Sequence, residues 1–186
     1  MSVILKMYQK LPGRTYQRLL TKYPLRMQAV QTGILMATGD QIAQVFVERR
    51  EYKDIDLVRT AQFGGLGFFL MGPAIRTWYG ILDKRIGSKG KTVILKKVVC
   101  DQLFFAPALI AVLLNSIGFL RGNNLEQNKE KLRNEYKDIL INNYKLWPMV
   151  QIVNFSLVPL EYQVLVVQIV AIFWNTYVSY RTHRDS

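Results

Sequence analysis

Cysteine and histidine are almost absent from this chain of 186 residues, which contains one of each, Cys100 and His183. A disulfide within one chain needs two cysteines, and structural zinc sites use several Cys and His ligands. A Ser, His and Asp triad would have to recruit the histidine at the extreme carboxyl end. We therefore expect no disulfide framework, no metal and no other cofactor. Because no nucleophile and base stand at a credible spacing, we also expect that the chain is not an enzyme.

Acidic residues are scarce as well, with 13 Asp and Glu against 25 Lys and Arg. Residues 1–39 contain no acid, and the connector 83–97 holds six basic residues with one acid. The connectors 48–59 and 121–145 are nearly balanced in charge. This uneven placement is typical of membrane proteins, in which basic segments lie against anionic lipid headgroups. With no recognisable nucleic-acid motif, we expect a lipid bilayer as partner and no nucleic acid.

Apolar residues gather into four blocks, roughly 25–47, 57–82, 93–120 and 146–180. A helix needs about 20 apolar residues to cross a bilayer, and each block is long enough. The mean hydropathy is only +0.07, because polar residues interrupt the blocks. The pattern predicts an all-α membrane protein, a bundle of four transmembrane helices. With four crossings, both chain ends and the connector 83–97 would share one side of the membrane.

The predicted organisation is a single membrane domain with two short flanks. It consists of a basic amino-terminal segment at 1–24, the helical bundle at 25–180 and a polar tail at 181–186. The opening run MSVIL is too brief for a secretory signal, whereas a basic leader without acids is compatible with mitochondrial import. The chain ends in RDS, so the peroxisomal carboxyl-terminal tripeptide is absent.

The first block combines small residues with an acid. Gly33 and Ala37 are spaced i, i+4 and form a strip that permits close approach of another helix, and Gly64 and Gly67 predict the same for the second block. Asp40 stands within the first block, where a carboxylate costs about 2.5–3.5 kcal/mol on insertion scales. It should therefore face the bundle interior, either as a structural hydrogen-bonding group or as part of a permeation path.

Three further charged residues lie inside the apolar blocks and need partners. Arg76 can pair with Asp40 or Asp101 from another helix, or its long side chain can extend to the membrane surface. Lys97 and Asp101 are spaced i, i+4, which predicts an ion pair within one helix. Cys100, beside them, is either an inert small apolar residue or a redox sensor.

Proline predicts where the helices bend. Pro73, Pro107 and Pro159 each lie within a long apolar block and should kink it, since proline lacks the amide hydrogen that the helix needs. Pro148 stands where a helix can start. We therefore predict a short helix before Pro159 and a longer one after it.

Two segments carry the pattern of a membrane surface. Trp78 and Tyr79 stand next to the charged end of the second block, as in an aromatic belt. The connector 121–145 places its apolar residues near one helical face. It predicts an amphipathic connector helix that lies on the membrane or packs on the bundle, with a solvated charged helix as the alternative.

The fourth block contains amides where hydrocarbon would penalise them. Asn143, Trp147, Gln151 and Asn154 fall on one side of a helix. They predict a polar stripe that points into the bundle.

Several motifs together resemble one known family. They are GDQIAQ at 39–44, GPAIRTWYGILD at 72–83, KKVVCDQLFFAP at 96–107, NYKLWPMVQIVNFSLVPLEY at 143–162 and WNTYVSY at 174–180. They are similar to the Mpv17/PMP22 family, over nearly the whole chain after residue 20. The resemblance implies a four-span protein of the mitochondrial inner membrane, with the peroxisomal membrane as the alternative. It also implies a link to mitochondrial DNA maintenance and a channel that modulates membrane potential. Many members have a histidine where this chain has Arg76.

Two functions remain open on these observations. The first is a channel or transporter for ions or small solutes, possible as a homo-oligomer because four helices enclose little space. The second is a membrane scaffold or assembly factor, in which the inward amides only hold helices together. The residues expected to line the path or to be buried and polar are Asp40, Gln44, Arg76, Asp101, Gln102, Gln151 and Asn154.

Overall fold

The computed structural model describes residues 13–88 and 90–184, and these are almost entirely helical. The amino-terminal residues 1–12 and residues 185–186 of the predicted tail lie outside the described part. Within the described residues there is no β-strand, so the prediction of an all-α chain is confirmed. The elements are α2 (Gly13–Lys22), α3 (Pro24–Ile42), η1 (Ala43–Val47), η2 (Tyr52–Asp54), α4 (Leu57–Leu66), η3 (Gly67–Met71), α5 (Gly72–Ile86), α6 (Lys91–Cys100), η4 (Asp101–Phe105), α7 (Ala106–Leu120), α8 (Leu125–Leu157) and α9 (Leu160–Arg184).

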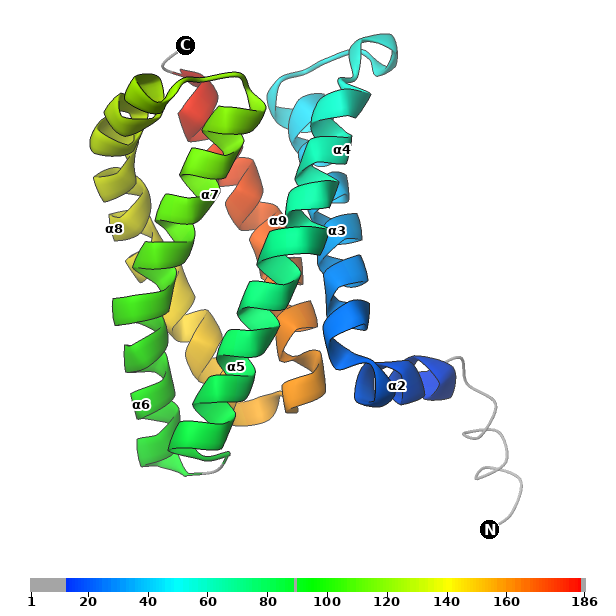
Figure 1. Ribbon diagram of the computed structural model, residues 1–186, viewed down its shortest axis with the longest axis vertical. Coiled ribbons are helices and arrows are strands. Elements are labelled where there is room, and N and C mark those ends of the chain that lie inside the picture. Colours follow the sequence, from blue (N-terminus) through cyan, green and yellow to red (C-terminus); the bar gives the residue numbers. More distant parts are fainter. Residues whose placement is uncertain (1–12, 89, 185–186) are drawn as a thin grey trace.

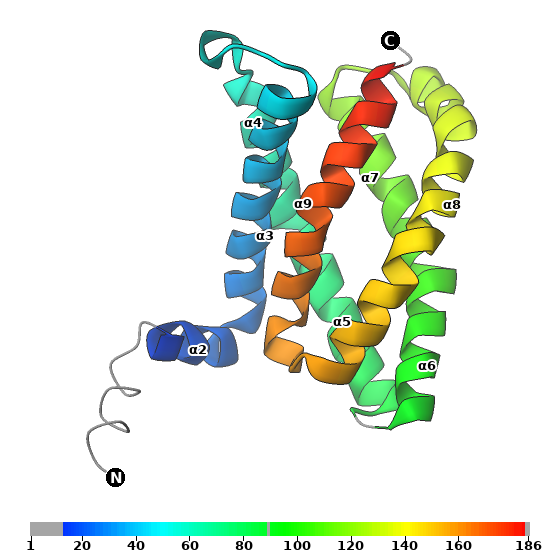
Figure 2. The same cartoon turned by 180° about the vertical axis from the view of Figure 1, so that it is seen from behind.

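Several of these elements follow one another without a break and form long rods. The rods are α3 with η1, α4 with η3 and α5, α6 with η4 and α7, and then α8 and α9. They pack side by side in an elongated bundle, and α2 lies across its lower end (Figures 1 and 2). We call the end near α2 and the α5–α6 connection the lower end, and the end near the α3–α4 and α7–α8 connections the upper end.

The direction of the last rods corrects the predicted topology. The chain descends along α8, turns at Val158 and Pro159, and ascends along α9 (Figure 1). The block 146–180, predicted as one crossing, therefore consists of two antiparallel segments, the end of α8 and α9. Since α3 and α9 both ascend, the end of α9 lies at the upper end, opposite to α2. Four crossings would place both chain ends on one side of a membrane, whereas the described chain starts at the lower end of the bundle and finishes at the upper end.

Proline positions account for the irregular turns. The π-helical segments η3 and η4 each end two residues before a proline, Pro73 and Pro107. Proline donates no hydrogen bond and crowds the preceding turn, and a wider turn is one way to accommodate it. Pro159 lies in the break between α8 and α9, whereas Pro148 lies inside α8, which corrects the predicted helix start. The connector 121–145 and the apolar run after it thus form one helix of 33 residues, α8.

The start of α8 shows why it begins where it does. The Asn124 side chain accepts from the Gln127 amide, and the Gln127 side chain accepts from the Asn124 amide. This reciprocal pair satisfies donors that the first helical turn leaves free. Gly122, with φ of 85°, supplies the turn from α7 into this cap.

Glycines allow α3 to pack tightly on the second rod. A Cβ atom at Gly67 would lie 2.7 Å from the Thr32 carbonyl oxygen, and one at Gly33 would lie 3.0 Å from the Gly64 carbonyl oxygen. A Cβ at Gly64 would lie 3.4 Å from the Ala37 Cβ atom. The four residues expected to pack helices therefore line one interface, between α3 and α4–η3.

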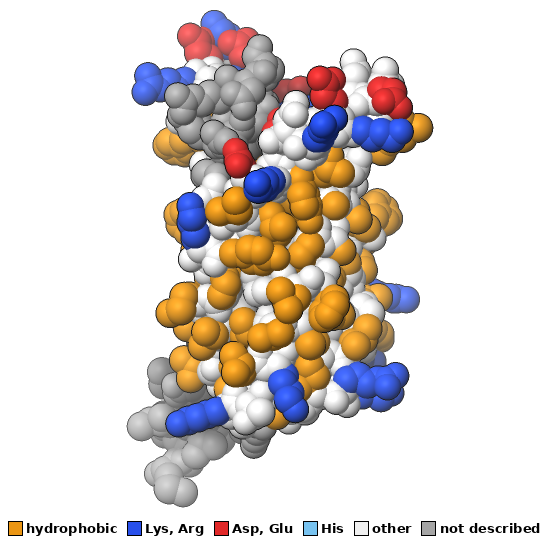
Figure 3. Space-filling view, turned by 90° about the vertical axis from the view of Figure 1, so that its left-hand side faces the viewer, with side chains coloured by type: hydrophobic (Ala, Val, Ile, Leu, Met, Phe, Trp, Pro, Cys, Tyr) orange, Lys and Arg blue, Asp and Glu red, His pale blue; other side chains and the backbone are white. Residues whose placement is uncertain are grey.

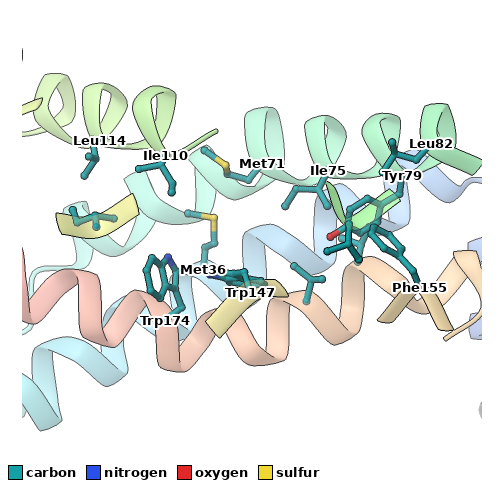
Figure 4. Close-up of a cluster of buried hydrophobic side chains, with 14 residues drawn as sticks. Met36, Met71, Ile75, Tyr79, Leu82, Ile110, Leu114, Trp147, Phe155 and Trp174 are labelled. Atoms are coloured by element: carbon teal, nitrogen blue, oxygen red, sulfur yellow. The ribbon is translucent and has the colours of Figure 1, made fainter. Parts of the chain in front are cut away.

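The distribution of polar and apolar side chains is inverted relative to a soluble bundle. Phe69 is 80% exposed and Phe173 is 75% exposed, whereas Gln28, Gln44 and Asn154 are fully buried. Apolar side chains cover the middle of the face in Figure 3, and charged side chains gather toward its two ends. The core still contains a conventional apolar cluster, with Tyr79 packed against Phe155 and Met36 near Trp147 and Trp174 (Figure 4).

One rod meets the length and composition of a membrane-crossing helix by itself. Among the described residues, the rod from Lys91 to Leu120 is long and apolar enough to cross a bilayer. The segment Leu160–Trp174 is a shorter apolar helix.

Candidate functional site

A buried carboxylate, Asp101, is the centre of a polar cluster inside the bundle. It lies in η4, in the middle of the third rod, and is 2% exposed. Its Oδ1 accepts a hydrogen bond from Trp78 Nε1 at 2.9 Å. Its Oδ2 accepts from Gln102 Nε2 at 2.8 Å and from Gln151 Nε2 at 2.9 Å. Three donors from three helical rods thus compensate the desolvation of this carboxylate.

Gln151 extends the cluster from the carboxylate to α5 and along α8. Its Nε2 also donates to the Tyr79 hydroxyl at 2.7 Å, and its Oε1 accepts from Asn154 Nδ2 at 3.1 Å. Tyr79 is 2% exposed, so the prediction that it belongs to a surface aromatic belt is wrong. The neighbouring Trp78 also points its indole nitrogen inward, because this nitrogen donates a hydrogen bond to Asp101.

A second branch runs from the carboxylate toward the middle of α8. Gln102 Oε1 accepts from Asn143 Nδ2 at 3.2 Å, and the Gln102 carbonyl accepts from the Tyr144 hydroxyl at 3.1 Å. Asn143 and Gln151 lie two turns apart on one side of α8, where the polar stripe was expected.

The cluster borders a cavity of about 100 Å³ within the bundle. Its polar wall is formed by Asp101, Gln102, Asn143, Gln151 and Gln168 together with the Tyr79 hydroxyl. Most of the lining is apolar, and side chains such as Met36, Met71, Trp147 and Trp174 point toward the same space in Figure 4. A space of this size with several polar groups can hold water molecules or a small polar solute.

Two polar atoms of α8 have no partner in the described part of the chain, one on a residue that lines the cavity and one on a residue that is hydrogen-bonded to the lining residue Gln151. They are Trp147 Nε1, a donor, and Asn154 Oδ1, an acceptor, and both are buried. A buried polar atom without a partner costs about 1–3 kcal/mol, so these atoms are positioned for water or a solute to satisfy them.

Asp40 and Gln44 form a separate cluster near the upper end. Arg59 Nε lies 2.7 Å from Asp40 Oδ1, and Asp40 Oδ2 accepts from Gln44 Nε2 and Thr60 Oγ1, each at 2.8 Å. Gln44 Oε1 in turn accepts from the Asp56 amide at 2.7 Å. These contacts fix α3 to the start of α4. Neither Asp40 nor Gln44 lines the cavity.

Further charges surround this upper cluster. Arg59 Nη1 lies 2.7 Å from Glu48 Oε1, so one guanidinium bridges two acids. At the start of the α7–α8 connection, partial burial lowers the pKa of Arg121, and the charge of Arg59 lowers it further. The negative charges of Glu48 and Glu135 act in the opposite direction and raise the pKa of Arg121. The α3–α4 and α7–α8 connections therefore interact electrostatically at the upper end.

The charged residues in the second and third rods have other partners than expected. Arg76 donates to the Leu160 carbonyl at 3.3 Å, so pairing with Asp40 or Asp101 is wrong. Lys97 Nζ lies 2.8 Å from Asp83 Oδ1, so its predicted pair with Asp101 is also wrong. The reason is geometric in both cases: each side chain reaches a nearer acceptor at the lower end of the bundle.

Local sequence patterns do not predict several contacts of these two clusters. Arg59 and Thr60 were not connected with Asp40, although Arg59 is a base at the start of an apolar block. Tyr79 was assigned to the surface because aromatic pairs beside charges are typical of belts. Within the described residues, no three His, Cys, Asp or Glu side chains gather as metal ligands, and the side chain of His183 lies outside that part.

Comparison with known proteins identifies relatives over nearly the full length. The sequence profile of the Mpv17 / PMP22 family matches residues 118–179. The mitochondrial inner membrane protein Mpv17 of Danio rerio is 42% identical over 171 residues, which cover 92% of this chain and 97% of that protein. Mpv17 of Homo sapiens is 43% identical over 171 residues, with the same coverage.

A fungal relative and the solved structures complete the comparison. The protein sym-1 of Neurospora crassa is 43% identical over 168 residues, covering 89% of this chain and 95% of that protein. No solved structure matches the chain. The resemblance seen in the motifs is thus confirmed at the level of whole sequences, and the chain belongs to the Mpv17 / PMP22 family.

Proposed function

We propose that this protein is a multi-pass channel or transporter for ions or small polar solutes in the mitochondrial inner membrane. The observation that carries the proposal is the cavity beside Asp101, a space with a polar wall in a bundle whose outer surface is apolar. Membrane proteins place ionisable groups toward the bundle interior or a water-filled space, and such groups mark solute pathways.

The membrane setting is supported by the surface. Strongly exposed apolar side chains occur on every rod, for example Ile34, Phe69, Phe104, Met149 and Phe173. In water, so large an apolar surface would lead to aggregation, whereas lipid tails solvate it. The named relatives are proteins of the mitochondrial inner membrane, which supports the same compartment for this chain.

The arrangement of the rods supports five crossings rather than four. The lower part of α8 exposes Ile141, Met149, Ile152 and Leu157, as a lipid-facing helix does. At 1.5 Å per residue, α8 and α9 are each long enough to cross the hydrocarbon, although their apolar parts, 146–157 and Leu160–Trp174, are shorter than about 20 residues. In this topology the amino-terminal helix α2 and the end of α9 face opposite sides of the membrane.

Conductance measurements on purified protein in planar bilayers test the proposal. The wild-type protein should conduct, and Asp101→Asn should lower the preference for cations over anions, because it removes the carboxylate from the cavity wall. Asp40→Asn is the matched control, since Asp40 is equally buried but lies outside the cavity. Folded wild-type protein that leaves the bilayer silent would contradict the proposal, as would equal selectivity changes in both variants.

A membrane scaffold is the second candidate, and one observation favours it. Most polar groups around Asp101 already bond to each other, which is how interhelical hydrogen bonds hold a bundle together. A scaffold predicts that Gln151→Leu and Asn154→Leu lower thermal stability in detergent while solute flux in proteoliposomes is unchanged. A transporter predicts that flux changes as well.

The family resemblance supports a wider role. We propose that flux through the bundle modulates the membrane potential and thereby supports mitochondrial DNA maintenance. A conduction-defective but stable Asp101 variant that restores normal mitochondrial DNA content to cells lacking the protein would contradict this link.

A further inference from the structure

The amino-terminal helix α2 is held across the lower end of the bundle. The chain turns at Tyr23, and Pro24 starts α3 in the new direction, so α2 runs transverse to the rods (Figures 1 and 2). A helix in this position lies in the plane of the membrane surface if the rods cross the membrane. Such helices are typical of membrane interfaces when they are amphipathic.

Specific contacts fix α2 in this position. Leu20 is 1% exposed and anchors the helix on the bundle. The Tyr16 hydroxyl accepts a hydrogen bond from the Gln31 side chain of α3. The Tyr16 ring lies 6.4 Å from that of Tyr162 in α9, measured between centroids. The orientation of α2 is therefore a property of the fold.

The outward side of this region mixes cations with apolar groups. Arg18, Lys22 and Arg26 are exposed, and so are Leu19 and Tyr23. Lys22 Nζ and the Arg26 guanidinium lie 5.3 and 5.8 Å from the centroid of the Tyr23 ring. Aromatic and aliphatic groups insert at the level of the headgroups, and long basic side chains reach their phosphates.

The rest of the lower end is also basic. At the α5–α6 connection, the acid Asp83 is paired with the buried Lys97, while Lys84, Arg85, Lys91 and Lys96 remain exposed. The other acid at this end is Glu161, in the first turn of α9. On the face in Figure 3, the charged side chains visible at the lower end are Lys or Arg, whereas both signs of charge occur at the upper end.

We propose that α2 and the neighbouring basic side chains form a binding surface for the headgroups of anionic phospholipids. The complementary charge is the argument for this occupant, because an acid-free, outward-facing set of cations beside apolar groups matches a phosphate-bearing lipid surface. The surface is separate from the cavity, so the proposal is independent of transport. It assigns the lower end to the membrane leaflet in which anionic lipid is available.

Thermal unfolding of the full chain in mixed micelles tests the proposal. Added phosphatidylglycerol should raise Tm, and phosphatidylcholine should not. The triple variant Arg18→Gln, Lys22→Gln and Arg26→Gln should require about a hundredfold more phosphatidylglycerol for half of the rise, since each of the three cations near an anionic surface contributes about a fivefold change in affinity. Salt at 0.5 M should weaken the wild-type response, because it screens exposed charges.

Two further variants keep the test specific. Lys53→Gln, Arg133→Gln and Lys137→Gln together remove three exposed cations near the upper end, and this variant should respond like the wild type. Arg18→Lys with Arg26→Lys preserves the charges and should also respond fully. The proposal is overturned if both lipids raise Tm equally, if the first triple variant keeps the full response, or if the upper-end variant loses as much.

Discussion

Gln151 Nε2 lies 2.9 Å from Asp101 Oδ2, although 50 positions separate the two residues in the chain. The same nitrogen also donates to the Tyr79 hydroxyl, so one amide joins the second, third and fourth rods. The contact places a carboxylate and its donors at the border of the cavity. The contribution of this contact to the stability of the bundle can be tested separately from its contribution to the passage of solutes.

Gln151→Leu should lower the free energy of unfolding by about 1–3 kcal/mol, because it removes a donor from a buried carboxylate and a buried hydroxyl. Thermal unfolding in detergent measures the change. Gln41→Leu is the matched control, since Gln41 is exposed in α3. Equal effects in the two variants would show that the buried hydrogen bonds contribute nothing specific.

Arg59→Gln should destabilise the upper end by about 3–5 kcal/mol, because it leaves the buried Asp40 carboxylate without its cation. Adding Asp40→Asn to this variant should recover part of the loss, which a double-mutant cycle quantifies. The exposed pair of Lys53 and Glu51 provides the comparison, and Lys53→Gln should cost less than about 1 kcal/mol. A double variant no more stable than Arg59→Gln alone would argue against the coupling.

Gly67→Ala should destabilise the protein by about 1–3 kcal/mol, since the new methyl group would lie 2.7 Å from the Thr32 carbonyl oxygen and force α3 away. Gly65→Ala is the control in the adjacent turn of the same rod, where a Cβ atom meets nothing within 4 Å. It should be neutral or stabilising by up to about 1 kcal/mol, because alanine favours a helix over glycine. The opposite order of melting temperatures would contradict the close packing.

Cysteine labelling in sealed vesicles should place Thr21 and Ser88 on one side of the membrane and Lys53 and Asn123 on the other. Each position is replaced by Cys in a Cys100→Ser background, which removes the only native thiol. A cysteine added after Ser186 should react with the Lys53 group, because α9 ascends beside α3. Reaction of that added cysteine with the Thr21 group would restore the four-crossing topology.

Local sequence patterns predict the helical fold and part of the candidate site. The inward positions of Asn143, Gln151 and Asn154 follow from helical spacing, because residues three or four apart share a face whatever the helix packs against. The burial of Asp40 and Asp101 follows from the cost of a carboxylate in hydrocarbon. The small-residue strip at Gly33 is a local feature of the same kind.

The partners of these residues could not be predicted in the same way. Arg76 and Lys97 were each assigned to an acid that suited their charge, yet Leu160 and Asp83 are nearer in space. Charge complementarity leaves several pairings open, and the distance that selects one of them depends on how the rods pack. Tyr79 shows the same limit, since its burial depends on Gln151 from another rod.

Composition, periodicity and charge, read along the chain, establish an all-helical protein with inward polar groups and a basic amino-terminal segment, because each depends only on neighbouring residues. The course of the chain after Pro159 is different. Whether a proline bends a helix or ends it depends on what the following segment packs against. Here α9 packs on α3, and that contact reverses the chain and separates its ends. The division into an upper charged cluster and a cavity beside Asp101 follows from the same packing.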